Sequence, residues 1–150
     1  MNKDNKENKR VVCLSYRTQI TPGHIDRMNG IEGDTASSTG MIWSVAVNYG
    51  DQQENTRAGG FAADKVARGE LTPDQIDEEL LESFLYTTGQ PMPDFILRTS
   101  GEMRISNFLL WQSAYAEFIV TDVLWPDFKR SDFDAAVAEF YSRSRRFGGS

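Results

Sequence analysis

The 150-residue sequence contains one cysteine and one histidine, and these two scarcities exclude several kinds of site. A lone Cys13 can form neither an internal disulfide nor a cysteine-based zinc site. The one histidine, His24, follows Pro22 and Gly23, so we expect an exposed loop position and no histidine-dependent triad. No apolar run approaches the roughly 20 residues of a membrane span, and the charged N-terminus does not resemble a signal peptide. We therefore expect a cytoplasmic protein.

Basic residues are outnumbered, with 16 Lys and Arg against 22 Asp and Glu and a net charge of −6. Nucleic-acid binding depends on a basic face that neutralises phosphates, so we expect no nucleic-acid partner. A small phosphate ligand needs only local positive charge, so the net negative charge does not exclude a ligand of this kind. The length suits one domain. Residues 1–9 are almost wholly polar and are expected to form a disordered tail, which leaves 10–150 as the folded part.

Strand and helix patterns alternate along the chain. Apolar or β-branched runs predict strands over 10–15, 41–48, 95–97 and 118–123, and the second of these is apolar enough for a strand buried on both faces. The pattern predicts an α/β fold with a mostly parallel sheet of about four strands and flanking helices. With one neighbour missing, such a sheet leaves an exposed edge.

Helix signals vary in strength. Thr72, Pro73 and Gln75 form a capping pattern that predicts a helix over 71–85, and Ser131 is the expected cap of a last helix. A helix within 16–40 is weakly indicated because glycines interrupt it. Residues 51–58 are polar and Gly59-Gly60 follows them, which argues against a stable helix there.

The segment from Phe95 to Tyr115 carries the main candidate site. A short apolar strand leads into a polar loop that starts at Arg98, and the apolar run 108–115 has helical length. A loop between a strand and a helix N-terminus collects anions, and guanidinium groups of Arg98 and Arg104 match phosphate oxygens. These residues predict a phosphate or diphosphate site; the alternative is two surface arginines on an ordinary loop. Asn48, at the end of another predicted strand, is a weaker candidate for the same crevice.

Several motifs resemble the cis-prenyltransferases, the undecaprenyl diphosphate synthase family. They are RTSGEMRISNFLLWQSAYAE (98–117), the following TDVLWPDF, the terminal RRFGG, WSVAVNYG (43–50) and LTPDQIDEELLESFLYTTGQPMPDFILRTSGE (71–102). They occur in the family order, so residues 9–149 are identified as the C-terminal part of a truncated cis-prenyltransferase fold. The family's N-terminal DGNGRWA motif, with its catalytic aspartate, is not in this sequence. No catalytic residue is therefore expected in this chain.

The resemblance implies a transferase that condenses isopentenyl diphosphate with an allylic diphosphate to give a membrane-associated polyprenyl diphosphate. It implies Mg²⁺ as cofactor, with Glu117 as its ligand. It also implies a homodimer, or a heteromer with a catalytic prenyltransferase subunit. The residues that it implies for isopentenyl diphosphate binding are Arg98, Arg104, Ile105, Ser106, Arg146 and Gly148.

Three functions remain open from the sequence. The chain is a cis-prenyltransferase that is incompetent alone, a non-catalytic subunit of a two-component prenyltransferase, or a diphosphate-binding module without catalysis. The terminal RRFGG fits the second, because such a subunit donates its Arg-x-Gly to a catalytic partner.

Overall fold

The computed structural model describes residues 8–143, which fall into two compact units that divide between Gly89 and Gln90. In the first unit the elements are β1 (Arg10–Leu14), η1 (Arg17–Gln19), α1 (Pro22–Thr35), β2 (Ile42–Ala46), α2 (Asp51–Ala67), η2 (Pro73–Gln75) and α3 (Glu78–Glu82). In the second they are β3 (Phe95–Arg98), β4 (Glu117–Val120), η3 (Trp125–Asp127) and α4 (Arg130–Ser142).

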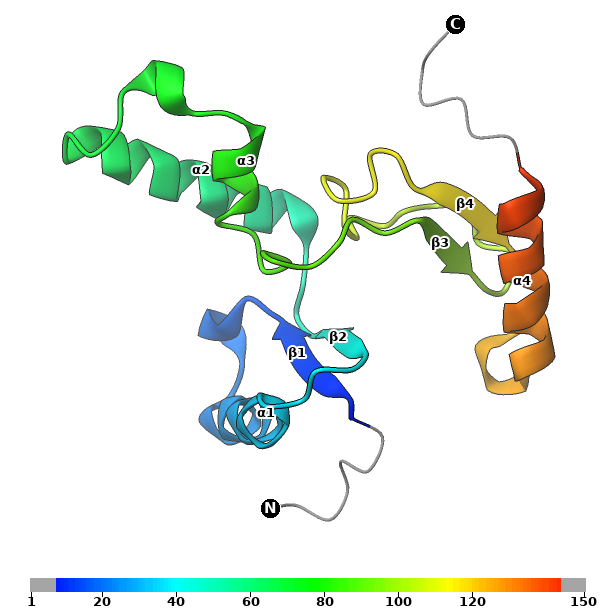
Figure 1. The fold of residues 1–150 in the computed structure, drawn as a ribbon. Helices are drawn as coiled ribbons and strands as arrows, with labels where there is room; N and C mark the ends of the chain where they lie inside the picture. The colour runs from blue at the N-terminus through cyan, green and yellow to red at the C-terminus, as the bar shows by residue number, and fades with distance from the viewer. Residues whose placement is uncertain (1–7, 144–150) are drawn as a thin grey trace, which may run out of the picture. The chain divides into compact units, whose positions relative to one another are not determined.

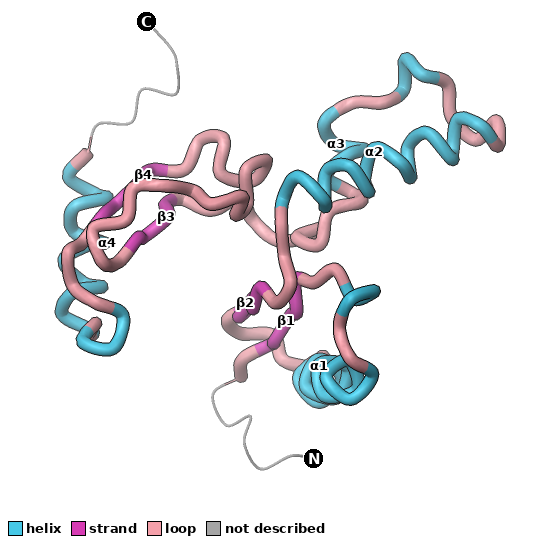
Figure 2. Tube along the Cα trace, turned by 180° about the vertical axis from the view of Figure 1, so that it is seen from behind, coloured by secondary structure: helices cyan, strands magenta, loops and turns pink. Residues whose placement is uncertain are grey.

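The predicted α/β class with parallel strands is confirmed, and four strands are present among the described residues. They form two parallel pairs, β1–β2 and β3–β4, where the sequence predicted one sheet. Figure 1 shows α1 beside the β1–β2 pair, α3 against α2, and α4 beside the β3–β4 pair. Figure 2 shows the two strand pairs in magenta from the opposite side.

The buried apolar core is small in each unit. Its members are Leu14, Met28, Ala58, Ala62 and Leu85 in the first unit, and Ile96, Ile119 and Ala136 in the second. The expectation that β2 is buried on both faces is wrong for this structure, since Ile42 is 40% and Trp43 59% exposed. Each described strand pairs with one other strand only, so none of them lies between two strands.

Helix α2 corrects the doubt raised by Gly59 and Gly60, because it runs unbroken through both. A Cβ atom at either glycine would meet nothing within 4 Å, so the glycines lie on an open face. Each glycine lowers the stability of the helix by about 1 kcal/mol relative to alanine, but neither one removes a packing contact. Ala58 and Ala62 are buried on another face of the helix, where their small side chains allow neighbouring segments to approach the helix closely.

Two acidic side chains near the start of α2 are buried, a feature that the polar pattern of 51–58 did not predict. Asp51 is 0% and Glu54 1% exposed. Glu54 accepts a 2.6 Å hydrogen bond from the Tyr49 hydroxyl and another from the Tyr86 backbone N–H. A buried carboxylate needs such donors, and here they tie α2 to the segment that follows α3.

The predicted helix over 71–85 is divided in two. Gln75 Oε1 accepts from the Thr72 N–H at 2.8 Å, so the predicted capping box is confirmed, but it caps a 3₁₀ turn. Asp77 then adopts extended backbone and becomes a second cap, accepting from the Leu80 N–H at 2.8 Å. The helix at the chain's end is confirmed, but it is capped by Lys129 and not by Ser131; the Lys129 N–H donates to Asp132.

Candidate functional site

The predicted phosphate loop lies wholly within the second unit, between β3 and β4. Arg98 ends β3, and residues 99–116 connect it to β4 without a helix. The expected helix over 108–115 is therefore absent, and with it the helix N-terminus that was to help bind an anion. Ser106, Asn107 and Leu109 have φ of 53°, 59° and 49°, and this left-handed backbone turns the chain where a helix needs negative φ.

The first part of the loop is fixed by backbone hydrogen bonds to the segment after β4. The Ser100 N–H donates to the Val123 carbonyl and the Gly101 N–H to the Thr121 carbonyl, both at 3.0 Å. Ser100 and Gly101 have φ of 64° and 66°, so the turn is held in a conformation that L-residues rarely adopt. Strained backbone that the surroundings fix in this way is common at binding sites.

The second part of the loop offers free backbone donors. The N–H groups of Arg104, Ile105 and Ser106 donate to no residue that the structure describes. Arg104 and Ser106 are exposed and Ile105 is half-buried. Backbone N–H groups without an acceptor in the protein are available to a bound anion.

The two arginines differ in their surroundings. The half-buried Arg98 side chain forms no hydrogen bond or ion pair with any residue between 8 and 143. Arg104 is 70% exposed and pairs with Glu102, Nη1 to Oε2, at 2.8 Å. The one sequence signal for this pair is the presence of opposite charges two residues apart in a glycine-containing loop.

Glu117, the predicted metal ligand, begins β4 and is engaged by Arg143. The Arg143 Nη1 donates to Glu117 Oε2 at 2.9 Å and to the Phe118 carbonyl at 2.8 Å. Hydrogen bonds to Glu139 and then Glu117 raise the pKa of Arg143 above its ordinary value. This contact joins the end of α4 to the start of β4.

Glu117 and Arg98 lie at opposite ends of the strand pair. In the parallel register Glu117 pairs with Phe95 and Arg98 with Val120, so three residues separate them along the strands. At about 3.3 Å per residue that is roughly 10 Å. No group of three or more His, Cys, Asp or Glu side chains that could hold a metal ion is found among residues 8–143. The assignment of Glu117 as a Mg²⁺ ligand therefore stays a prediction, since the described residues show no other carboxylates grouped with it.

Two predicted ligands, Arg146 and Gly148, lie outside the described residues. Asn48 lies in the first unit at the end of β2, with φ of 49°, and its side-chain amide donates to the Tyr16 carbonyl at 2.9 Å. That bond gives Asn48 a structural role. None of the helices among the described residues has the length and apolar composition needed to cross a membrane.

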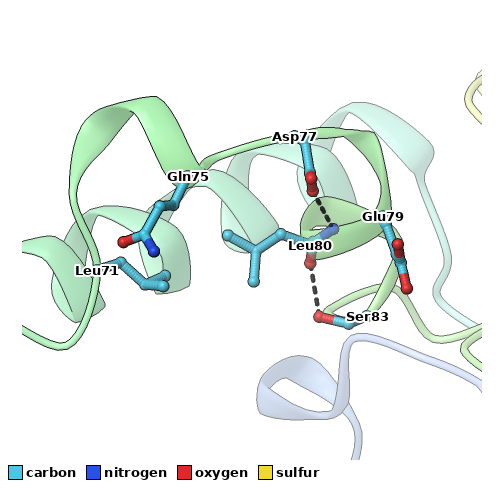
Figure 3. A pocket seen from close by; sticks show the side chains of 6 residues that line it. All are labelled: Leu71, Gln75, Asp77, Glu79, Leu80 and Ser83. Atoms are coloured by element: carbon cyan, nitrogen blue, oxygen red, sulfur yellow. Dashed lines mark hydrogen bonds between the residues drawn. The ribbon is translucent and has the colours of Figure 1, made fainter.

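A shallow depression of about 490 Å³ lies in the first unit, on residues unrelated to the loop. Figure 3 shows Leu71 and Leu80 in it, with the Asp77 cap bond and a Ser83 hydroxyl that donates to the Leu80 carbonyl. These polar groups satisfy helix ends and present no converging set towards a ligand.

Comparison with known proteins decides the family. A family model described as "Putative undecaprenyl diphosphate synthase" matches residues 1–148. The chain belongs to this family. Its relatives include the isoprenyl transferase of Bacillus subtilis strain 168, 44% identical over 96% of this chain and 55% of that protein. Another is the ditrans,polycis-undecaprenyl-diphosphate synthase of Escherichia coli K12, 47% identical over 97% of this chain and 57% of that protein.

Solved structures of cis-prenyltransferases agree with this family assignment. Lavandulyl diphosphate synthase from Lavandula x intermedia, in complex with dimethylallyl diphosphate, has a TM-score of 0.91 and 34% identity over 95% of this chain and 61% of that one. A probable undecaprenyl diphosphate synthase from Campylobacter jejuni has a TM-score of 0.81 and 29% identity. The cis-prenyltransferase fold is thus confirmed, and the chain spans just over half the length of the curated relatives it matches.

Proposed function

We propose that this chain is the isopentenyl-diphosphate-binding part of a cis-prenyltransferase that makes a polyprenyl diphosphate from isopentenyl and allylic diphosphates. The observation that carries the proposal is the Arg98–Ser106 loop. It combines one arginine without a described partner, a second arginine in an exposed ion pair, and three open backbone N–H groups. A diphosphate can accept from all of these donors, and charge-assisted hydrogen bonds are the stronger kind.

Within this proposal the loop binds and orients, and it moves no proton. The Arg104, Ile105 and Ser106 backbone positions one phosphate group, while Arg98 at the strand end meets the other. Mg²⁺, when bound, would neutralise charge on the leaving diphosphate. Glu117 would contribute one of its oxygens, since Arg143 holds the other. The remaining ligands would come from phosphate oxygens and residues outside this chain.

The proposal extends to the assembly. Arg146 and Gly148 would approach the isopentenyl diphosphate of a partner subunit, in a homodimer or a heteromer with a catalytic prenyltransferase subunit. A cytoplasmic location and a membrane-associated product belong to the same proposal. No catalytic residue is assigned to this chain, so we expect no turnover by the chain alone.

Calorimetric titration with isopentenyl diphosphate tests the binding role. Each charge-assisted hydrogen bond contributes about 1.5–3 kcal/mol, so Arg104→Ala is expected to weaken binding by about tenfold or more. Arg130→Ala is the matched control because Arg130 lies in the same unit and its side chain is 93% exposed. Equal affinities in the Arg104 variant, the Arg130 variant and the wild type would refute the proposal.

A second assay tests whether the chain is catalytically active alone. It measures incorporation of isopentenyl diphosphate into extractable polyprenyl product, with Mg²⁺ and farnesyl diphosphate present. Turnover by the purified chain that Arg104→Ala abolishes would show that the chain catalyses without the DGNGRWA part. That result would leave the binding role intact and overturn the proposed incompetence.

A second candidate is a diphosphate-binding subunit that serves a catalytic partner. The Arg143–Glu117 ion pair favours it, because it neutralises the one carboxylate predicted to meet the metal ion. A chain that binds isopentenyl diphosphate without Mg²⁺, and that raises the activity of a catalytic homologue, would support this candidate.

A further inference from the structure

The hydrogen-bond ladder between β3 and β4 continues one residue past β4 and then becomes irregular. The Thr121 N–H donates to the Arg98 carbonyl at 2.8 Å, which is the position of the next regular bond. In a regular parallel ladder the bond after it would run from the Ser100 N–H to the Thr121 carbonyl. Instead the Thr121 carbonyl accepts from the Gly101 N–H at 3.0 Å. The Ser100 N–H donates to the Val123 carbonyl, also at 3.0 Å, so the loop leaves β3 one residue out of register.

This irregular pairing shapes the start of the candidate loop. Ser100 and Gly101 have φ of 64° and 66°, a region that is sterically disfavoured for any residue except glycine. Ser100 therefore adopts it because its surroundings hold it there. The two carbonyls that accept from these residues lie on the 121–123 segment, directly after β4. Their positions determine the direction in which the chain continues towards Arg104.

The Thr121 side chain fixes the two accepting carbonyls relative to each other. Its hydroxyl oxygen accepts a hydrogen bond from the Val123 N–H at 3.3 Å and so closes a turn across Asp122. Threonine hydroxyls commonly close local turns of this kind. Val123 is half-buried and its N–H donates to no backbone carbonyl of the described chain, so without the hydroxyl that donor would lose its acceptor. The turn also packs closely on the loop, because a Cβ atom at Gly101 would lie 3.1 Å from Asp122 Oδ1.

We propose that Thr121 is a positioning residue for the isopentenyl diphosphate loop, and that it acts through its hydroxyl group without touching the ligand. The hydroxyl shapes the 121–123 turn, and the turn holds Ser100 and Gly101 in their left-handed conformation. That conformation directs the open N–H groups that follow, from Arg104 to Ser106, towards the diphosphate. The inference rests on the proposed function, because it names a residue that shapes the proposed binding site.

Hydrogen exchange of the full 150-residue chain without ligand tests the effect on the loop. Thr121→Val removes the hydroxyl and keeps the β-branched shape, whereas Thr121→Ser keeps the hydroxyl. Thr18→Val is the matched control, because Thr18 is exposed in the first unit and its hydroxyl has no hydrogen bond to a described residue. We expect the Ser100 and Gly101 amides to exchange about threefold to tenfold faster in Thr121→Val only. Unchanged exchange of these amides would overturn the proposal.

Titration calorimetry with isopentenyl diphosphate tests the effect on binding. Thr121→Val is expected to bind about threefold to tenfold more weakly, while Thr121→Ser and Thr18→Val bind like the wild type. Thermal unfolding of the same samples reports on stability alone. A lower Tm in Thr121→Val with unchanged affinity would show that the hydroxyl only stabilises the end of β4, and would overturn the proposal. Equal weakening in Thr121→Ser would also contradict it, since serine keeps the hydroxyl.

Arg104→Ala separates this inference from the proposed function. If Arg104→Ala weakens binding and Thr121→Val does not, the loop binds the diphosphate and the positioning role of Thr121 is wrong. If the wild type binds no isopentenyl diphosphate, the proposed function fails and the positioning role fails with it. Weaker binding in both variants, together with faster exchange of the loop amides in Thr121→Val, would support both.

Discussion

If Arg104 binds a diphosphate as proposed, replacing Glu102 by glutamine should strengthen that binding, because Glu102 would compete with the ligand for Arg104. The two side chains are paired at 2.8 Å, with 37% and 70% of their surfaces exposed. An exposed ion pair contributes about 0.2–1 kcal/mol, and a diphosphate must displace or share it. Glutamine keeps the size and removes the charge. Removing the competition, together with some repulsion between carboxylate and ligand, should tighten binding about twofold to tenfold.

The assay is titration calorimetry with isopentenyl diphosphate at low and at high salt, without Mg²⁺. The gain should shrink at high salt, since screening weakens exposed charges. Glu78→Gln makes the same change of net charge at an exposed residue of the first unit and should leave the affinity unchanged. If Glu102→Gln weakens binding, or if Glu78→Gln strengthens it equally, the competition between Glu102 and the ligand is refuted.

The other predictions concern stability and titration. Tyr49→Phe removes the 2.6 Å bond to the buried Glu54 carboxylate and should cost about 1.5–3 kcal/mol, lowering Tm by roughly 5–10 °C in thermal unfolding. Gly101→Ala should cost about 1–2 kcal/mol because its φ is +66°, whereas Gly59→Ala on the open face of α2 should stabilise by up to about 1 kcal/mol; denaturant unfolding measures both. Burial, followed by the charge of a nearby glutamate, raises the pKa of the Cys13 thiol, so iodoacetamide should alkylate it more slowly at pH 8–9 than it alkylates free cysteine.

Controls accompany these measurements. Tyr16→Phe makes the same substitution in the first unit where the hydroxyl has no hydrogen bond to a described residue, and it should change stability by less than about 0.5 kcal/mol. A loss equal to that of Tyr49→Phe would contradict the role of the buried bond. For Cys13 the unfolded chain is the reference. Since the folded pKa is the higher one, the thiol's contribution to stability should be present below the unfolded pKa and lost as pH rises through the folded pKa. Equal alkylation rates in folded and unfolded chain would refute the shift.

Local patterns predicted the strands and the terminal helix well, because period and composition report directly on backbone choice. These patterns failed where tertiary contacts determine the secondary structure of a segment. The 108–115 segment has helical length and apolar residues, but left-handed backbone at Ser106, Asn107 and Leu109 replaces the helix. Helix α2 has a polar and glycine-broken sequence, yet the buried Glu54 and its donors fix it in place.

The residues of the candidate site could be predicted from the sequence, but the hydrogen bonds and ion pairs that they form could not. Arg98 and Arg104 stood out because guanidinium groups suit phosphate. Their different partners, and the ion pair between Glu117 and Arg143 across 26 residues, depend on how β4 and α4 pack, which no periodicity encodes. The family resemblance supplied roles for these residues, and the roles remain predictions for the experiments above.

Glu32 limits where a further strand can pair with the first unit. Its carboxylate closes one edge of the β1–β2 pair through the Cys13 N–H and is itself fixed by Arg17 at 2.7 Å. A strand pair with one edge covered in this way can add a strand on its other side only. A pair with two open edges has a valence of two and can extend into a fibre. The Glu32 side chain thus blocks growth of this small sheet on the side that it covers.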